Sequence, residues 1–89
     1  MLVYPTTAYF RHVRQRPDRG IIDDEWIIRV IQEPEREEIQ LDGRVRRWKR
    51  IVEADGRALR VILLADKATI HNAFFDRDYR EPSDESQVF

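Results

Sequence analysis

Residues 42–76 read DGRVRRWKRIVEADGRALRVILLADKATIHNAFFD, and this stretch decides the fold. Two Asp-Gly pairs, at residues 42–43 and 55–56, interrupt runs rich in apolar residues, and Asp66-Lys67 separates two further runs. Asp-Gly is a strong signal for a two-residue hairpin turn, because a type I′ turn needs positive φ at both central positions. The sequence therefore predicts a four-stranded antiparallel meander over residues 35–41, 44–54, 57–65 and 68–76.

Two amphipathic segments precede this predicted sheet. Residues 7–16 form the first expected helix, which a threonine can cap and Pro17 ends. Asp23 is a suitable N-cap for the second helix, in which apolar residues recur at helical spacing as far as Pro34. We expect an α+β fold in which both helices pack on one face of the sheet.

Composition limits the classes of protein that the chain can belong to. Its 89 residues are 42% hydrophobic and 37% charged, which predicts one α+β domain over residues 1–80 and an acidic, disordered tail over residues 81–89. There is no cysteine, so the chain forms neither a disulfide nor a thiolate metal site. No apolar run approaches the ~20 residues of a membrane span, and a signal-peptide pattern is absent. We expect a cytoplasmic protein without a membrane partner.

Two-residue turns at the three connectors would fix the pairing across the sheet. The expected partners are Leu41 with Arg44, Ala54 with Arg57, and Ala65 with Ala68. One face is then mostly apolar and is the expected core: Ile39, Leu41, Trp48, Val52, Leu59, Val61, Leu63, Ile70 and Phe74. The exceptions on this face are Asn72, Arg46 and Arg50, of which the two arginines must reach outward or pair with the acidic second helix. The opposite, open face mixes charged with apolar side chains: Glu38, Gln40, Val45, Arg47, Lys49, Ile51, Glu53, Arg60, Ile62, Leu64, Thr69, His71, Ala73 and Phe75.

The net charge of −1 conceals a basic middle, because residues 40–60 carry seven basic and three acidic side chains. Such a segment is typical of a nucleic-acid footprint, but it can equally complement the acidic residues 21–39 within one fold. The overall balance, with a pI near 6.1, argues against strong non-specific binding of nucleic acid.

His71 is the foremost candidate for chemistry on the open face. Histidine exchanges protons near neutral pH, and cationic neighbours would lower its pKa and favour the neutral base. With Arg60 and Lys49 as electrostatic partners, His71 could act as general base or acid in the cleavage of a phosphodiester. The alternative is a strand histidine that hydrogen-bonds a neighbour and does no chemistry.

Further basic residues are candidates for binding phosphate. Arg47 and Lys49 lie on the predicted open face, and His12 with Arg16, one helical turn apart, could hold a phosphate at the edge of the sheet. Arg77 and Tyr79 follow the last strand and could reach the same face. Two histidines without a carboxylate cluster are too few for a zinc site, so we expect no metal and no cofactor.

The same open face also fits a non-catalytic role. Ile51, Ile62, Leu64 and Phe75 are too apolar to leave in water, so the face could pair with a partner protein or with a second copy of the chain. From the residues alone, a non-catalytic interaction module and a nuclease are both retained as hypotheses.

Several motifs together resemble a known family. They are His12-x-x-x-Arg16, Trp26-Ile27, Asp42-Gly43-Arg44-x-Arg46-x-Trp48, Leu59-Arg60-Val61-Ile62 and Thr69-x-His71-Asn72-Ala73-Phe74-Phe75-Asp76-Arg77. Over roughly residues 9–79 they resemble a family of small bacterial proteins of unknown function that is similar in layout to the RelE- and BrnT-like ribonuclease toxins.

This resemblance implies a compact helix-helix-sheet fold that cleaves RNA without a metal and is held by an antitoxin-like partner. The residues that it points to are Arg60, His71, His12 and Arg16. The low pI and the acidic residues 81–89 depart from the toxin pattern, because both would repel a polyanion. Shared layout does not by itself carry shared activity.

Overall fold

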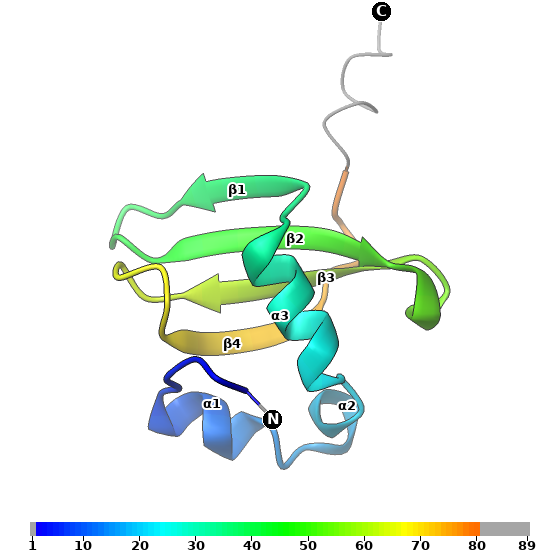
Figure 1. Cartoon of the computed structure of the whole chain (residues 1–89), viewed down its shortest axis with the longest axis horizontal. Coiled ribbons are helices and arrows are strands. Elements are labelled where there is room, and N and C mark those ends of the chain that lie inside the picture. Colours follow the sequence, from blue (N-terminus) through cyan, green and yellow to red (C-terminus); the bar gives the residue numbers. More distant parts are fainter. Residues whose placement is uncertain (1, 81–89) are drawn as a thin grey trace, which may run out of the picture.

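The computed structural model describes residues 2–80, so the tail expected over residues 81–89 lies outside the described residues. The fold is α+β, with four antiparallel strands in the order β1-β2-β3-β4 (Figure 1), as the meander predicts. The strands are β1 (Arg36–Ile39), β2 (Val45–Ile51), β3 (Arg57–Leu63) and β4 (Ile70–Phe75).

Three helices precede the sheet, one more than the sequence predicts. They are α1 (Ala8–Val13), α2 (Pro17–Gly20) and α3 (Asp24–Gln32). The Thr7 side chain caps α1 by accepting a hydrogen bond from the Phe10 backbone N–H at 3.0 Å. The expected helix over residues 7–16 is too long, because Pro17 begins a helix of its own at the N1 position, where its missing N–H costs nothing.

Helix α3 covers one face of the sheet, whereas α1 and α2 lie beside its β4 edge, so the expectation that all helices pack on one face is wrong for these two (Figure 1). Helix α3 lies across β2 and β3, and α1 packs against β4 (Figure 1). Asp23 caps α3 as expected, accepting from the Glu25 N–H at 2.8 Å. The core between the layers is fully buried and apolar, and its burial is the main stabilising contribution; it contains Phe10, Ile22, Ile27, Val30, Ile31, Val45, Ile51, Ala54, Leu59, Val61, Leu63, Ile70 and Ala73.

The first hairpin has a three-residue loop, where a two-residue turn is expected. Gln40 and Arg44 close the hairpin through a 2.8 Å backbone hydrogen bond, and the Gly43 N–H donates to Gln40 O at 2.9 Å. Only Gly43 takes a positive φ, of 89°, as in a type I turn followed by a left-handed glycine. The register is therefore one residue from the predicted one, and Arg36 faces Trp48.

The second connector also differs, and it reverses the faces of β2. Asp55 and Gly56 do take positive φ, but residues Val52–Ala54 form a short 3₁₀ helix before them. Gly56 N–H donates to Ile51 O at 3.0 Å, and Ile51 faces Arg57. The expected partner of Arg57 is Ala54, so β2 is shifted by three residues relative to β3. Because this number is odd, every side chain of β2 lies on the opposite face of the sheet from the predicted one.

The last strand follows the predicted register only at its start. Ile70 faces Leu63, as the expected pairing of residues 65 and 68 requires, but a β-bulge follows, and Asn72 then faces Ile62. The extra residue is His71. A bulge moves the following side chains to the other face, so Ala73 and Phe75 join the helix-covered side, while Asn72 and Phe74 lie on the open face.

The face prediction is thus right for β3 and wrong for β2 and most of β4. Arg47, Lys49 and Ile51 share the helix-covered face with Leu59, whereas Trp48 lies on the open face with Arg60. Trp48 is only 5% exposed there, because Ala58 and Tyr79 pack with it in a second, smaller buried cluster. Of the four apolar residues that the sequence predicts on the open face, Ile51 and Phe75 therefore lie on the helix-covered face instead.

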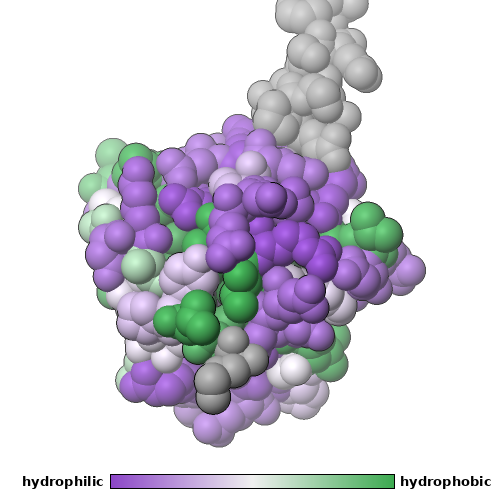
Figure 2. All heavy atoms as spheres, viewed as in Figure 1, coloured by the Kyte–Doolittle hydropathy of each residue, from purple (hydrophilic) through white to green (hydrophobic). Residues whose placement is uncertain are grey.

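The visible surface around α3 is mainly hydrophilic (Figure 2). Apolar surface appears at the end of the sheet where the β1–β2 hairpin turns, and again at the opposite end near the connection to β3. No helix among residues 2–80 is long and apolar enough to cross a membrane.

Candidate anion-binding site

His71 lies at the bulge, next to the segment that leads into α1. Its Nδ1 atom is 3.2 Å from the Thr7 hydroxyl oxygen, and its ring stacks on that of Tyr9 with centroids 5.0 Å apart. Burial lowers the pKa of His71, and the charge of Arg44 adds to this, while Asp42 opposes it. The lowered pKa agrees in direction with the sequence argument, but its causes are not Lys49 or Arg60.

Arg60 lies on the open face and is held between two aromatic rings. Its guanidinium carbon is 5.4 Å from the Trp48 ring centroid and 5.1 Å from that of Phe74, and its Nη1 is 3.6 Å from Asp76 Oδ2. The Nε atom is buried and has no hydrogen-bond partner among residues 2–80. Burial and the nearby Arg46 lower the pKa of Arg60, although an arginine of this kind stays charged.

Arg47 and Lys49 point to the other side of the sheet and complete the end of α3. Arg47 Nη1 donates to Ile31 O at 2.8 Å, and its Nε donates to Glu37 at 2.7 Å. Lys49 Nζ donates to Glu33 O at 3.0 Å. Cations at a helix C-terminus satisfy its last carbonyl groups and favour its dipole, so the placement of these two residues is structural.

The expected convergence of His71, Arg60, Arg47 and Lys49 on one face does not occur. The register places Arg47 and Lys49 under α3 and Arg60 on the open face, and the bulge turns His71 toward Thr7.

His12 and Arg16 are exposed side chains. His12 belongs to α1, and Arg16 immediately precedes α2. Neither side chain forms a hydrogen bond or an ion pair within the part of the chain that the structure describes.

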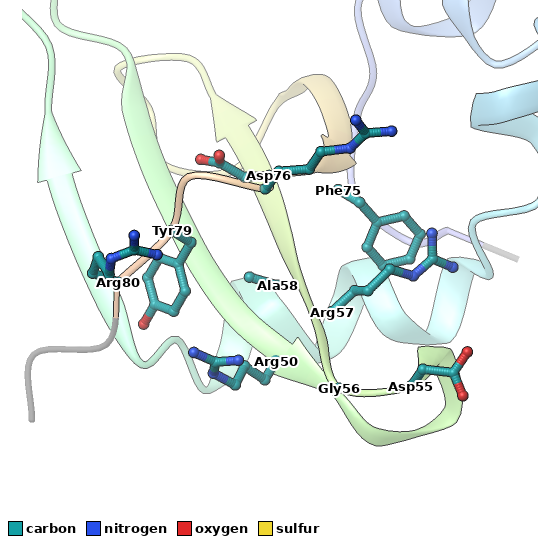
Figure 3. Close-up of a pocket in the computed structure, with 10 residues that line it drawn as sticks. Arg50, Asp55, Gly56, Arg57, Ala58, Phe75, Asp76, Tyr79 and Arg80 are labelled. Atoms are coloured by element: carbon teal, nitrogen blue, oxygen red, sulfur yellow. The ribbon is translucent and has the colours of Figure 1, made fainter. Parts of the chain in front are cut away.

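A pocket of about 380 Å³ opens where the chain leaves the sheet (Figure 3). Arg57 and Phe75 lie on one side of it, whereas Arg50, Tyr79 and Arg80 lie across the strands on the other. Four arginines and two aspartates line it, giving a positive site; the lining residues are Arg50, Asp55, Gly56, Arg57, Ala58, Phe75, Asp76, Arg77, Tyr79 and Arg80.

Arg57 is the best-placed cation of this pocket. Its guanidinium carbon is 4.0 Å from the centroid of the Phe75 ring, beside which Figure 3 shows it, and its Nε donates to Ala54 O at 3.1 Å. Within residues 2–80, neither Arg57 nor Arg77 forms an ion pair with a carboxylate. Since a guanidinium presents a planar fork of N–H donors, the two free Nη groups of Arg57 are suited to an oxyanion.

The two aspartates offset only half of the charge of the four arginines that line the pocket. Asp55 points away from the other labelled residues (Figure 3). Asp76 is already engaged, because Trp48 Nε1 donates to it at 2.9 Å and the Asp78 N–H at 2.9 Å. The arrangement can therefore hold an anion, but it contains no histidine to move a proton.

A second hollow of about 230 Å³ adjoins the first. It shares Asp76, Tyr79 and Arg80 with the pocket and adds Arg36 and Trp48 from the open face, together with Glu38 and Asp78. The ring of Tyr79 stacks on Trp48 with centroids 6.0 Å apart, and Tyr79 is only 7% exposed. Tyr79 therefore forms the wall between the arginine pocket and a second hollow that is lined by two arginines and three carboxylates.

Sequence reasoning found part of this site. It selected Arg77 and Tyr79, which line the pocket, but missed Arg50, Arg57 and Phe75. The sequence predicts Arg57 only as the first residue of a strand, opposite Ala54, and it predicts Phe75 on the open face because nothing in it marks the bulge at His71.

Comparisons with known proteins add no assignment: no family model, curated protein or solved structure matches the chain. Among residues 2–80, no group of three His, Asp or Glu side chains could hold a metal ion.

Proposed function

We propose that the chain is a non-catalytic binding module for single-stranded RNA. The observation that carries this proposal is the guanidinium of Arg57, which lies against Phe75 with both Nη groups free in a pocket that also contains Arg77 and Arg80. Arginine forks recognise phosphate oxygens, and phosphate contacts supply most of the affinity for nucleic acid.

A polymer is favoured over a single small anion by the second hollow. The two hollows adjoin, and Arg80 lines both, so successive phosphates could lie along the surface that runs from Arg57 toward Arg36. The ring of Phe75 is half-buried beside the first hollow and offers an apolar surface to a base or a sugar. The carboxylates of Glu38 and Asp78 on the second hollow limit the affinity to a moderate value.

Cleavage is the less favoured form of the proposal. A ribonuclease would need a proton-transfer group within hydrogen-bond reach of the phosphate. The only histidine of the sheet, His71, is engaged with Thr7 at the bulge and does not line the arginine pocket. The toxin-like activity would therefore require a site elsewhere, around His71 and the nearby α1.

Titration of a fluorescein-labelled single-stranded RNA into the protein, followed by fluorescence anisotropy, tests the proposal. We expect binding by the parent and at least a tenfold loss in the double variant Arg57→Gln/Arg77→Gln. The salt slope of log K should also become less steep by about 1.4, since each lost single-strand phosphate contact contributes about 0.7.

The matched control is Arg11→Gln/Arg44→Gln, which removes the same charge from exposed positions outside the pocket. Equal losses of RNA affinity in both double variants would show that the effect comes from net charge alone, and would overturn the assignment of the pocket as the binding site. Absence of RNA binding by the parent, including capture of an acidic protein in its place, would overturn the RNA proposal. Cleavage of the RNA that disappears in His71→Ala would overturn the non-catalytic part and favour the nuclease.

A further inference from the structure

The strand β1 forms an edge of the sheet, and its outer side has no partner within residues 2–80. The opposite edge is protected at its start, where Thr6 bridges to Ile70 and the Ile70 backbone exchanges hydrogen bonds with Pro5 O at 2.9 Å and Thr7 N at 3.0 Å. Figure 1 shows α1 beside β4, whereas β1 lies at the far edge from it. An open edge is a template for another strand.

Alternation identifies which backbone groups of β1 point outward. In an antiparallel pair, the backbone of every second residue forms hydrogen bonds to the neighbouring strand. Gln40 N donates to Arg44 O of the β2 side at 2.8 Å, so the residues two and four positions before Gln40 also face β2. Glu38 therefore bonds β2, while Glu37 and Ile39 direct their N–H and C=O groups away from the sheet. Within residues 2–80 these four groups have no partner strand, so water or an incoming strand can satisfy them.

The edge is charged at its start and apolar toward the hairpin, because three of the four β1 residues are charged and the last is Ile39. Ile39 is 63% exposed, and the neighbouring Leu41 is fully exposed. Proteins often protect such edges with short strands, charged side chains or a proline. Here both acids already have a cation partner within the chain, because Glu37 pairs with Arg47 at 2.7 Å and Glu38 pairs with Arg36 at 2.9 Å.

We propose that β1 pairs with β1 of a second copy of this chain, in antiparallel orientation about a twofold axis at Glu38. Glu37 then faces Ile39 of the second copy, and the symmetric pair repeats this contact, so all four outward backbone groups of each strand form hydrogen bonds. The result is one continuous eight-stranded sheet. The proposal is independent of RNA binding.

This register places the two Glu38 side chains opposite each other, and their repulsion is offset by Arg36 and Arg46 of each copy. Arg36 faces Gln40 of the second copy, and the two Glu38 carboxylates meet between the two Arg36 guanidiniums, with Arg46 of each copy 3.9 Å from its own Glu38. On the other face, Ile39 and its symmetry mate are diagonal neighbours, within reach across a strand pair. A hollow of about 470 Å³ beside Ile39 and Leu41 gives the apolar side chains room to pack.

An unrelated extended peptide would satisfy the same backbone groups, but its side chains would have to carry charges that match those of Arg36, Glu38 and Arg46. A second copy supplies them by symmetry, and closed twofold pairing is the commonest form of association for a single chain. The second copy is therefore the occupant that the observations favour.

Sedimentation equilibrium over about 1 to about 200 µM protein tests the pairing, since a dimer responds to concentration by mass action. We expect the parent to reach twice the monomer mass, and Ile39→Lys to raise the dissociation constant at least tenfold. A lysine at the edge opposes strand addition without disturbing the bonds to β2. Val52→Lys, which places the same charge on a residue that is 84% exposed at the other end of the sheet, should dimerise like the parent.

Circular dichroism melts establish that both variants are folded. Hydrogen exchange supplies the second measurement: the amides of Glu37 and Ile39 should exchange more slowly as the parent is concentrated, and the Glu38 amide should not change. A parent that stays monomeric over the whole range would overturn the proposal. A dimer that Ile39→Lys and Val52→Lys weaken equally, or one without protection at these two amides, would also contradict it.

Discussion

The Nδ1 atom of His71 lies 3.2 Å from the Thr7 hydroxyl oxygen, within hydrogen-bond distance, and the same oxygen accepts the Phe10 N–H that caps α1. A hydroxyl has one proton and two lone pairs, so beside the cap it can donate to a bare Nδ1 or accept from an Nδ1–H. The bulged strand and the first helix are thus linked through one histidine, whose lowered pKa favours the neutral form.

The neutral histidine gives the first prediction, which concerns stability against pH. Burial and Arg44 lower the pKa of His71 in the folded state below its ordinary value near 6.5. The unfolded chain therefore binds the proton more readily, and the free energy of unfolding falls as the pH drops from above 6.5 toward the folded pKa. Urea titrations of the parent at pH 7.5 and at pH 5 should show this loss.

The matched variant for this test is His71→Asn, whose side-chain amide can replace Nδ1 as the partner of the Thr7 hydroxyl but does not titrate. Its stability should change less with pH than that of the parent over the same interval. Identical pH slopes in the two proteins would show that His71 does not link protonation to folding.

The bulge at His71 also explains a large part of the difference between expectation and structure. The sequence before it predicts the pairing of Leu63 with Ile70 correctly, because the turn chemistry and the apolar alternation agree there. No glycine or proline marks residue 71 as a bulge. One extra residue then moves Phe75 into contact with Trp26 of α3, with ring centroids 6.4 Å apart, which no local pattern could indicate.

The strand β2 shows a second limit of sequence reasoning. Trp48 and Ile51 are three residues apart, so they cannot lie on the same face of a strand. From the sequence alone, Trp48 is predicted on the core face because it is the larger apolar side chain, and Ile51 is predicted on the open face. In the structure Ile51 is fully buried under the helices, and Trp48 is buried on the open face by Tyr79, a residue beyond the last strand. The cover that Tyr79 provides is a tertiary contact, so the periodicity of β2 carries no sign of it.

The β3 strand was predictable for the opposite reason. Leu59, Val61 and Leu63 occupy every second position and are all fully buried. Ile62 and Leu64 on the other face are apolar too, so the charge of Arg60 is what marks that face as the outer one. The sequence therefore predicts the correct face for Arg60, although it does not predict its neighbours Trp48 and Phe74.

Gly43 provides a prediction about the first hairpin. A Cβ at this position would meet Ala65 Cβ at 3.5 Å, an ordinary contact, so space does not oppose a side chain. The φ of 89° does oppose it. Gly43→Ala should lower the free energy of unfolding by about 1 to 2 kcal/mol. Gly43→Asn should cost less, since asparagine tolerates left-handed backbone, and equal costs in chemical denaturation would refute the conformational explanation.

Asp76 provides a prediction about the open face. Burial raises its pKa, but the hydrogen bonds from Trp48 and the Asp78 N–H and the charge of Arg60 outweigh this and lower it. Asp76→Ala leaves the indole N–H and the half-buried guanidinium without their acceptor, so it should cost about 2 to 3 kcal/mol in urea unfolding. The exposed Asp78→Ala should stay within about 0.5 kcal/mol of the parent. Similar stabilities for the two variants would show that this network contributes little.

Arg47 separates a structural role from a role in binding phosphate. Its guanidinium donates to Ile31 O and to Glu37, on the face that α3 covers and away from the arginine pocket. Arg47→Met retains the apolar stem but loses both bonds, so we expect the free energy of unfolding to fall by about 1 kcal/mol. RNA affinity, measured by anisotropy well below the melting temperature, should decrease less than in Arg57→Gln, which removes the same charge from the pocket. An affinity loss in Arg47→Met as large as that in Arg57→Gln, with stability unchanged, would return Arg47 to the phosphate-binding role that the sequence first assigned to it.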